Sequence, residues 1–189
     1  MSREQLINSA VATALEVVDN VEPDQLGAPT PCPDWNVRQL VNHLLFWGPS
    51  LAGAARKEPV PPPAESEADV DLTTGDWAAA LATGLKSTAA AWSEPEAWTG
   101  TTSVGSPQQL PATMIGAMVL GETVVHTWDL ARATGQSPTW DRELLEFVHA
   151  DLVETAAMGR EMGLYGPEVP VPSDAPLIDR VLGLTGRTP

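Results

Sequence analysis

The chain has 189 residues, of which 43% are hydrophobic, and its formal net charge at pH 7 is −15. This size and composition are typical of a globular protein with a core of its own and exclude wholesale disorder. A surface this acidic repels nucleic-acid phosphates and anionic membranes, so we predict neither as a partner. The one cysteine, Cys32, excludes an internal disulfide. The sequence has no signal-peptide or membrane-span pattern, and we therefore expect a cytoplasmic protein.

Apolar residues at helical spacing predict a first helix at residues 4–21, which a proline ends. A proline-rich segment follows, and either Asp34 or Asn36 is expected to cap a second helix at 37–56. Residues 58–75 combine acidic side chains with four prolines, which predicts an exposed loop. Its acidic residues lack the spacing of an EF-hand, so we expect them to be solvated rather than to bind calcium.

The rest of the chain continues the helical pattern. A third helix is predicted at 76–92, and the segment 93–109 is predicted to be either a short strand or irregular chain. A fourth helix is expected at 111–133, with a proline in its first turn and a glycine after its end. A fifth is expected at 141–162, and a short helix is expected at 175–184 in the tail.

Long helices with few strand signals place the chain in the all-α class and indicate a helical bundle. We predict a single domain spanning residues 1–189. Within it, the bundle is expected to cover about residues 4–162, and a short extra helical tail is expected at 163–189.

The fourth predicted helix carries a group of polar side chains on its apolar face. Glu122 and His126 are four residues apart and share one side of a helix, and Asp129 falls in the same arc of about 100°. His43 flanks the apolar stripe of the second helix. Burying such groups without partners costs several kcal/mol, and a cation would pair them. The residue types alone are compatible with a divalent metal site or with a hydrogen-bonded polar cluster.

Several segments together resemble a known family. They are TPCPDWNVR at 30–38, NHL at 42–44, ETVVHTWDLARATG at 122–135 and YGPEVPVPSDAPLIDR at 165–180. This ordered set resembles the actinobacterial DinB-like proteins, which are similar to the N-terminal domain of mycothiol-dependent maleylpyruvate isomerase. The tail resembles that of a short branch of the group.

The resemblance implies a DinB-like four-helix bundle with one divalent metal ion between the second and fourth long helices. The ion is usually zinc, with Ni²⁺ or Fe²⁺ as alternatives, and by motif match its ligands would be His43, Glu122 and His126. It also implies a low-molecular-weight thiol such as mycothiol as co-substrate. The isomerases carry a further C-terminal domain, and the short segment after residue 133 argues against maleylpyruvate as the substrate.

Two imidazoles and one carboxylate leave a net charge near +1 on a divalent ion, which would acidify a water or thiol beside it. We therefore predict a zinc-dependent thiol transferase or isomerase whose partners are a small-molecule thiol and a small electrophile, with a homodimer as an open option. Two alternatives stay open. One is a non-catalytic metal- or ligand-binding module, and the other is a mononuclear iron(II) oxygenase.

Two residues near the predicted ligands have more than one interpretation, and the sequence assigns no catalytic residue. Asp129 is expected to orient an imidazole, to act as a fourth ligand, or to form a salt bridge with Arg132. Arg132 is expected to bind a substrate carboxylate or to form an ordinary ion pair. Cys32 precedes His43 by a helical distance of about 15 Å, so we expect a structural role for it. The tryptophans either wall the site or fill the core.

Overall fold

The structure is a computed structural model that describes residues 1–33 and 35–189. Asp34, one of the two expected caps of the second helix, lies outside the described residues. Contacts within the chain divide it into two compact units, residues 1–138 and 139–189, which we describe separately. Helices dominate both, and the all-α class is confirmed.

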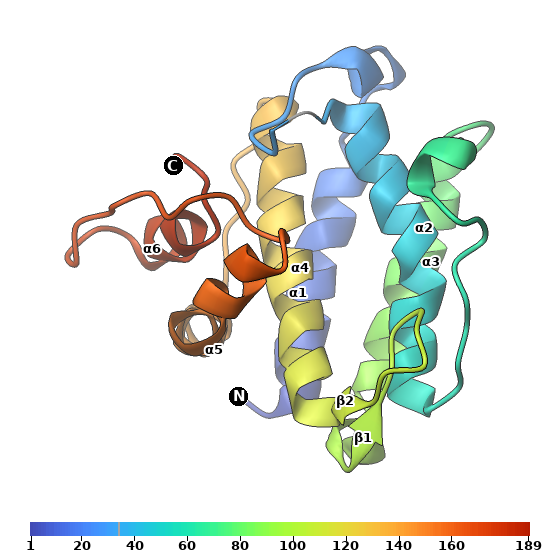
Figure 1. Cartoon of the computed structure of the whole chain (residues 1–189). Helices are drawn as coiled ribbons and strands as arrows, with labels where there is room; N and C mark the ends of the chain where they lie inside the picture. Colours follow the sequence, from blue (N-terminus) through green and yellow to red (C-terminus); the bar gives the residue numbers. More distant parts are fainter. Residues whose placement is uncertain (34) are drawn as a thin grey trace. The chain divides into compact units, whose positions relative to one another are not determined.

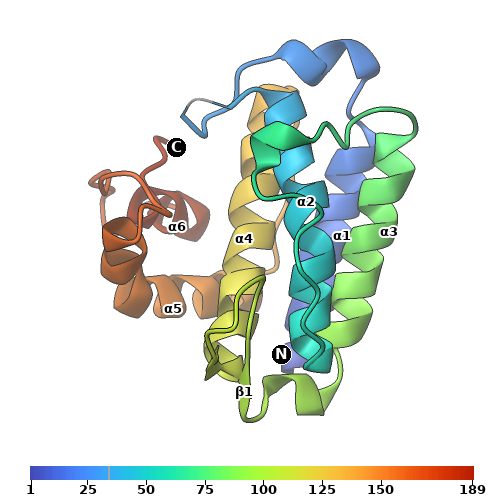
Figure 2. The same cartoon turned by 45° about the vertical axis from the view of Figure 1, so that its right-hand side comes forward.

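The first unit contains four long helices (Figure 1). They are α1 (Arg3–Asp19), α2 (Val37–Arg56), α3 (Trp77–Trp92) and α4 (Ala112–Ala133). Helices α1 and α2 each pack against both α3 and α4. Figures 1 and 2 show that α2 and α3 run opposite to α1 and α4, because the loop at 58–75 returns along the length of α2 before α3 begins. The loop therefore lies beside the helix that carries His43.

Local sequence signals explain where these helices begin and end. Ser2 caps α1 with a reciprocal hydrogen bond from Gln5, and Asn36 caps α2 in the same way with Gln39. Asp76 caps α3 through the backbone N–H of Ala79. The helices predicted at 37–56, 76–92 and 111–133 are confirmed to within one residue at each end. The first helix ends two residues earlier than predicted, where Asn20 caps it.

Short elements connect the helices. They are η1 (Pro23–Gly27), η2 (Glu67–Asp69), η3 (Pro95–Trp98) and an antiparallel pair of strands, β1 (Thr101–Thr102) and β2 (Leu110–Pro111). The short strand that was one of two expectations for 93–109 is therefore present as β1, and its partner falls just beyond that segment.

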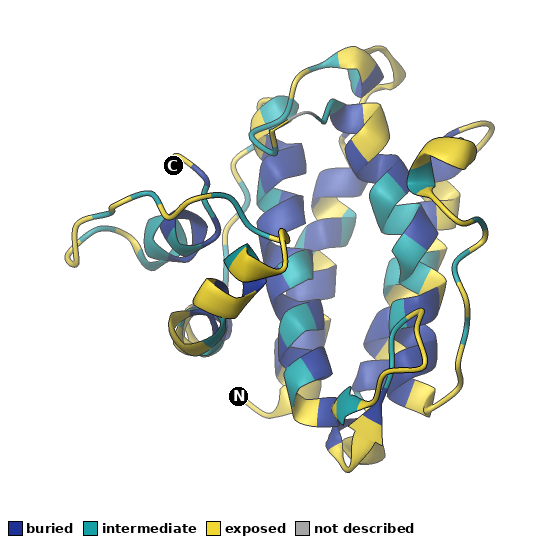
Figure 3. Ribbon diagram, viewed as in Figure 1, coloured by how far each residue is buried: buried dark blue, intermediate teal, exposed yellow. Residues whose placement is uncertain are grey.

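The core of the first unit fills the space between the four helices, where their facing sides are buried (Figure 3). At one end, Trp92 and Trp98 pack edge to face with ring centroids 5.2 Å apart. The indole N–H of Trp98 donates to the Trp92 carbonyl at 2.8 Å. Gly116 of α4 allows this packing, because a Cβ atom there would lie 2.3 Å from the Trp98 ring. This tight contact holds α4 against the segment that precedes β1.

The second unit consists of α5 (Arg142–Glu161), α6 (Leu177–Leu184) and the chain between them, and the two helices pack against each other. The sequence analysis expected α5 in the bundle and only 163–189 in the tail. In the structure the first compact unit ends before α5, and both α5 and α6 fall in the second unit. That the whole chain forms a single domain remains a prediction. None of the described helices is long and apolar enough to cross a membrane.

Candidate metal centre

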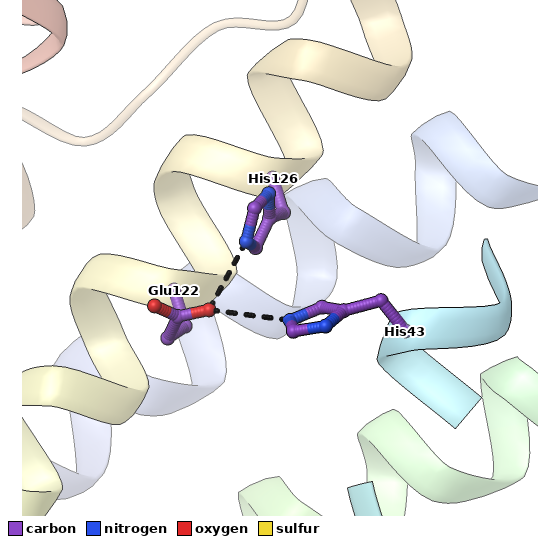
Figure 4. Close-up of side chains that lie close together, drawn as sticks. All are labelled: His43, Glu122 and His126. Atoms are coloured by element: carbon purple, nitrogen blue, oxygen red, sulfur yellow. Dashed lines mark ion pairs between the residues drawn. The ribbon is translucent and has the colours of Figure 1, made fainter. Parts of the chain in front are cut away.

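The structure brings His43, Glu122 and His126 together, although they come from two helices (Figure 4). His43 lies on α2, and Glu122 and His126 lie one turn apart on α4. The Glu122 Oε2 atom is 3.1 Å from His126 Nε2 and 3.8 Å from His43 Nε2. One ligand atom from each of the three residues lies within 4.8 Å of the other two. These are the three residues that motif matching had predicted as ligands.

The geometry of this cluster fits a divalent cation. Ligand atoms about 2.0–2.1 Å from a tetrahedral zinc ion lie roughly 3.3 Å from one another. The two carboxylate–imidazole distances, 3.1 and 3.8 Å, bracket that value. Two imidazole nitrogens and one carboxylate oxygen also match the donor types of zinc sites that keep a position free for water or substrate. The residues present therefore fit the metal that the sequence predicted.

Burial makes the electrostatics of the cluster strong. The His126 side chain is 9% exposed and that of Glu122 is 27% exposed. Burial by itself would raise the pKa of Glu122, but the charges and hydrogen bonds of His126 and His43 outweigh it and hold that pKa well below its usual range. The carboxylate is therefore ionised and attracts either protons on the imidazoles or a cation.

The pKa values of the two histidines are shifted in the opposite direction, upward. Burial alone would lower the pKa of His126, but the charge of Glu122 and the hydrogen bond with Asp129 raise it to about 9. Burial likewise works against protonation of His43, but its hydrogen bonds with Glu122 and Glu67 raise its pKa above the ordinary value. Without a metal, His126 at neutral pH therefore holds a proton that competes with a metal for its ring nitrogen.

Asp129 lies one turn beyond His126 on α4. Its carboxylate Oδ2 is 3.1 Å from His126 Nδ1, and the side chain is fully buried. This contact leaves the Nε2 atom of His126 directed at Glu122. Of the expectations stated for Asp129, the geometry corresponds to the acceptor that orients an imidazole. The guanidinium of Arg132 lies over the Trp128 ring, 5.9 Å from its centroid, on an exposed part of α4.

Glu67 is a site residue that the sequence analysis missed. Its carboxylate oxygens lie 3.1 and 3.2 Å from His43 Nδ1, and its Oε1 atom accepts a 2.7 Å hydrogen bond from the Trp47 indole. The expectation that the acidic residues of 58–75 are merely solvated is therefore wrong at Glu67. The carboxylate orients His43 from the loop, as Asp129 orients His126 from the helix.

Asn42 explains why the loop reaches His43. Its side-chain amide donates to the carbonyls of Glu67 and Val70, both at 3.1 Å. Its side-chain oxygen accepts from the Leu72 backbone at 2.8 Å. The residue that precedes His43 in the NHL motif thus fastens the loop to α2. This motif was the available signal for a contact between loop and site, although it does not identify Glu67.

The aromatic and cysteine residues of the proline-rich segment take different places. The Trp35 ring centroid lies 4.6 Å from that of His43 and 5.9 Å from that of His126, so Trp35 walls the cluster. Cys32 belongs to the turn closed by Thr30, whose hydroxyl bonds to the Cys32 backbone. Among the described residues, Cys32 is not part of the group that fits a metal.

Comparison with known proteins identifies the family of the chain. The sequence pattern described as "Mycothiol maleylpyruvate isomerase N-terminal domain" matches residues 8–131. An uncharacterised protein, found in two strains of Mycobacterium tuberculosis, is 31% identical over 171 residues, which cover 89% of this chain and 88% of the relative.

Solved structures show the fold. The crystal structure of the mycothiol-dependent maleylpyruvate isomerase matches with a TM-score of 0.62 at 15% identity, covering 83% of this chain and 71% of the other. The structure of a histidine-to-alanine mutant of that enzyme matches with a TM-score of 0.63 at 16% identity. These matches confirm the predicted DinB-like bundle fold.

Proposed function

The chain belongs to the mycothiol maleylpyruvate isomerase N-terminal domain family, and we propose that it binds one divalent cation through His43, Glu122 and His126. We further propose that the cation is zinc and that the protein uses a low-molecular-weight thiol of the mycothiol type. The thiol would either be transferred to a small electrophile or assist the isomerisation of that electrophile. The observation that carries the proposal is the approach of three ligand atoms to within 4.8 Å of one another. A cytoplasmic location suits this chemistry, because thiols are kept reduced there.

When bound, a divalent cation at this position supplies Lewis acidity that favours the thiolate over the thiol. The residues of the chain supply the rest. Glu122 brings the negative charge that makes the position attractive to a cation. Asp129 and Glu67 each hold one imidazole by its Nδ1 atom, so that both Nε2 atoms face Glu122.

Trp35 contributes by limiting access of water. Its ring packs against both imidazoles on the side of the proline-rich segment. Excluding water strengthens the electrostatic interactions of the cluster and protects a reactive thiolate from protonation. The residues of the chain would therefore bind the cation, orient its imidazole ligands and shield the site from water.

The first test is the metal content of untagged protein, measured by mass spectrometry for the wild type and for His126→Ala. We expect near-stoichiometric zinc in the wild type and its loss in the variant. Glu122→Gln should lower the metal content while keeping the helical circular dichroism spectrum. Wild-type protein that contains no metal and takes up none on zinc addition would overturn the proposal.

The second test concerns activity. Thiol consumption with a panel of thiols and small electrophiles should require the metal-loaded protein. A metal-loaded protein that accelerates none of these reactions would leave a non-catalytic metal-binding module as the function. Stoichiometric iron instead of zinc would favour an iron(II) oxygenase, because two histidines and a carboxylate also suit that metal.

A further inference from the structure

A cavity of about 480 Å³ lies beside the candidate metal centre, between α2 and the loop at 58–75. Two of its lining residues also contact the centre. The Trp35 ring centroid is 4.6 Å from that of His43, and the Glu67 carboxylate is 3.1 Å from His43 Nδ1. A molecule in this cavity therefore lies next to a predicted metal ligand. The volume suits a small molecule.

The walls of the cavity combine aromatic rings with carboxylates. Trp35, Phe46 and Trp47 contribute the rings, and Phe46 and Trp47 pack edge to face at 5.2 Å. Glu65 and Glu67 contribute the carboxylates from the loop. Indole faces and carboxylates both attract cations, the first through the ring quadrupole and the second through charge. The aromatic and the acidic side chains of the cavity thus both favour a positively charged ligand.

Positive charge that would favour an anion is missing from these walls. None of the described lining residues is lysine or arginine. The loop at 58–75 carries five acidic side chains and no basic one. Arg38 of α2 contacts this loop, but its guanidinium lies 3.7 Å from the Asp71 carboxylate and donates to the Thr73 hydroxyl at 2.7 Å. A carboxylate in the cavity would therefore meet like charge without a counter-charge from the described lining residues.

We propose that this cavity binds a positively charged organic group, such as an alkylammonium, and that the small electrophile of the adjacent centre carries such a group. The statement about the electrophile rests on the proposed function, whereas cation binding by the cavity does not. The ammonium would lie between the indole faces and the loop carboxylates. The electrophilic part of the same molecule would extend toward His43.

The test is a pair of probes of similar size and opposite charge, benzyltrimethylammonium and phenylacetate. Binding is followed by NMR at the indole N–H signals, at pH 7 and low ionic strength, for metal-free and for zinc-loaded protein. We expect the ammonium to bind at least about tenfold more tightly than the carboxylate in both forms. Equal binding of the two probes, or binding of neither, would overturn the proposal.

Substitutions in the cavity wall test which residues produce the preference for the ammonium probe. Glu65→Gln should weaken ammonium binding about threefold, because Glu65 is exposed and its charge is partly screened. Ala68→Lys, which adds a positive charge to the cavity wall, should weaken it further and strengthen phenylacetate binding, whereas Ala68→Gln should do neither. Glu16→Gln removes an exposed charge from α1, outside the cavity, and should leave both affinities unchanged.

The same experiment separates this proposal from the proposed function. If the ammonium preference holds in protein that binds no metal, the cavity assignment stands and the proposed function fails. If metal binds as expected but Glu65→Gln and Ala68→Lys behave like their controls, the cavity assignment fails and the metal centre stands.

Discussion

Protons and zinc compete for the same nitrogen atoms, so zinc affinity should depend steeply on pH. The pKa of His126 in the metal-free protein is about 9. The ring is then neutral in about 1% of molecules at pH 7 and in about 50% at pH 9. Zinc binding should therefore strengthen about 50-fold between these pH values through this group alone. The raised pKa of His43 adds to the effect in the same direction.

The assay is competition for zinc with a chromophoric chelator of known pH dependence, from pH 6.5 to 9.5. Calorimetry in two buffers of different ionisation enthalpy should show that about one proton or more is released per zinc ion at pH 7. An exposed histidine with an ordinary pKa would be mostly neutral at pH 7 and would release little. Affinity that is constant between pH 7 and 9, after correction for the chelator, would refute the ion-paired state of the metal-free cluster.

Three further predictions concern the first unit. Metal-free protein should lose about 3 kcal/mol of stability to urea as the pH rises from 6.5 to above 9, because His126, whose pKa is raised from 6.5 to about 9, then gives up its proton and its ion pair. Asp129→Asn should weaken zinc binding about tenfold with an unchanged helical spectrum, measured by the same competition, because the buried acceptor loses its charge. Gly116→Ala should lower urea stability by about 1–3 kcal/mol, because the new Cβ would lie 2.3 Å from the Trp98 ring; Gly121→Ala, with open space around its position, should not lower it.

The part of the fold that was predictable from sequence is the part set by local signals. Caps such as Asn36 act within one turn, and the apolar periodicity of α2 and α4 shows which face is buried. The relation between Glu122, His126 and Asp129 follows from helical spacing alone. Periodicity does not identify the partner of a buried face, however. For that reason α5 was expected in the bundle, whereas in the structure it groups with α6 in the second compact unit.

The contact between Glu67 and His43 was beyond local reasoning. The two residues are 24 positions apart, and Glu67 lies in a proline-rich acidic loop whose composition indicates only solvation. The contact depends on the return of that loop along α2 and on the hydrogen bonds of Asn42. Neither the path of the loop nor these hydrogen bonds produce a periodic pattern in the sequence. A tertiary contact of this kind becomes visible only when the path of the loop is known.

The two imidazoles are consequently held by parts of the fold with different constraints. His126 is oriented by Asp129 of the same helix, and any change there must preserve the packing of a fully buried carboxylate. His43 is oriented by a partly exposed residue of a loop that also lines the adjacent cavity. Substitutions in the loop can therefore alter the cavity and the orientation of one ligand together, while the ligands and the bundle stay the same. Because surface loops tolerate change better than buried helix faces, we expect specificity within this family to vary through the loop at 58–75 more readily than through α4.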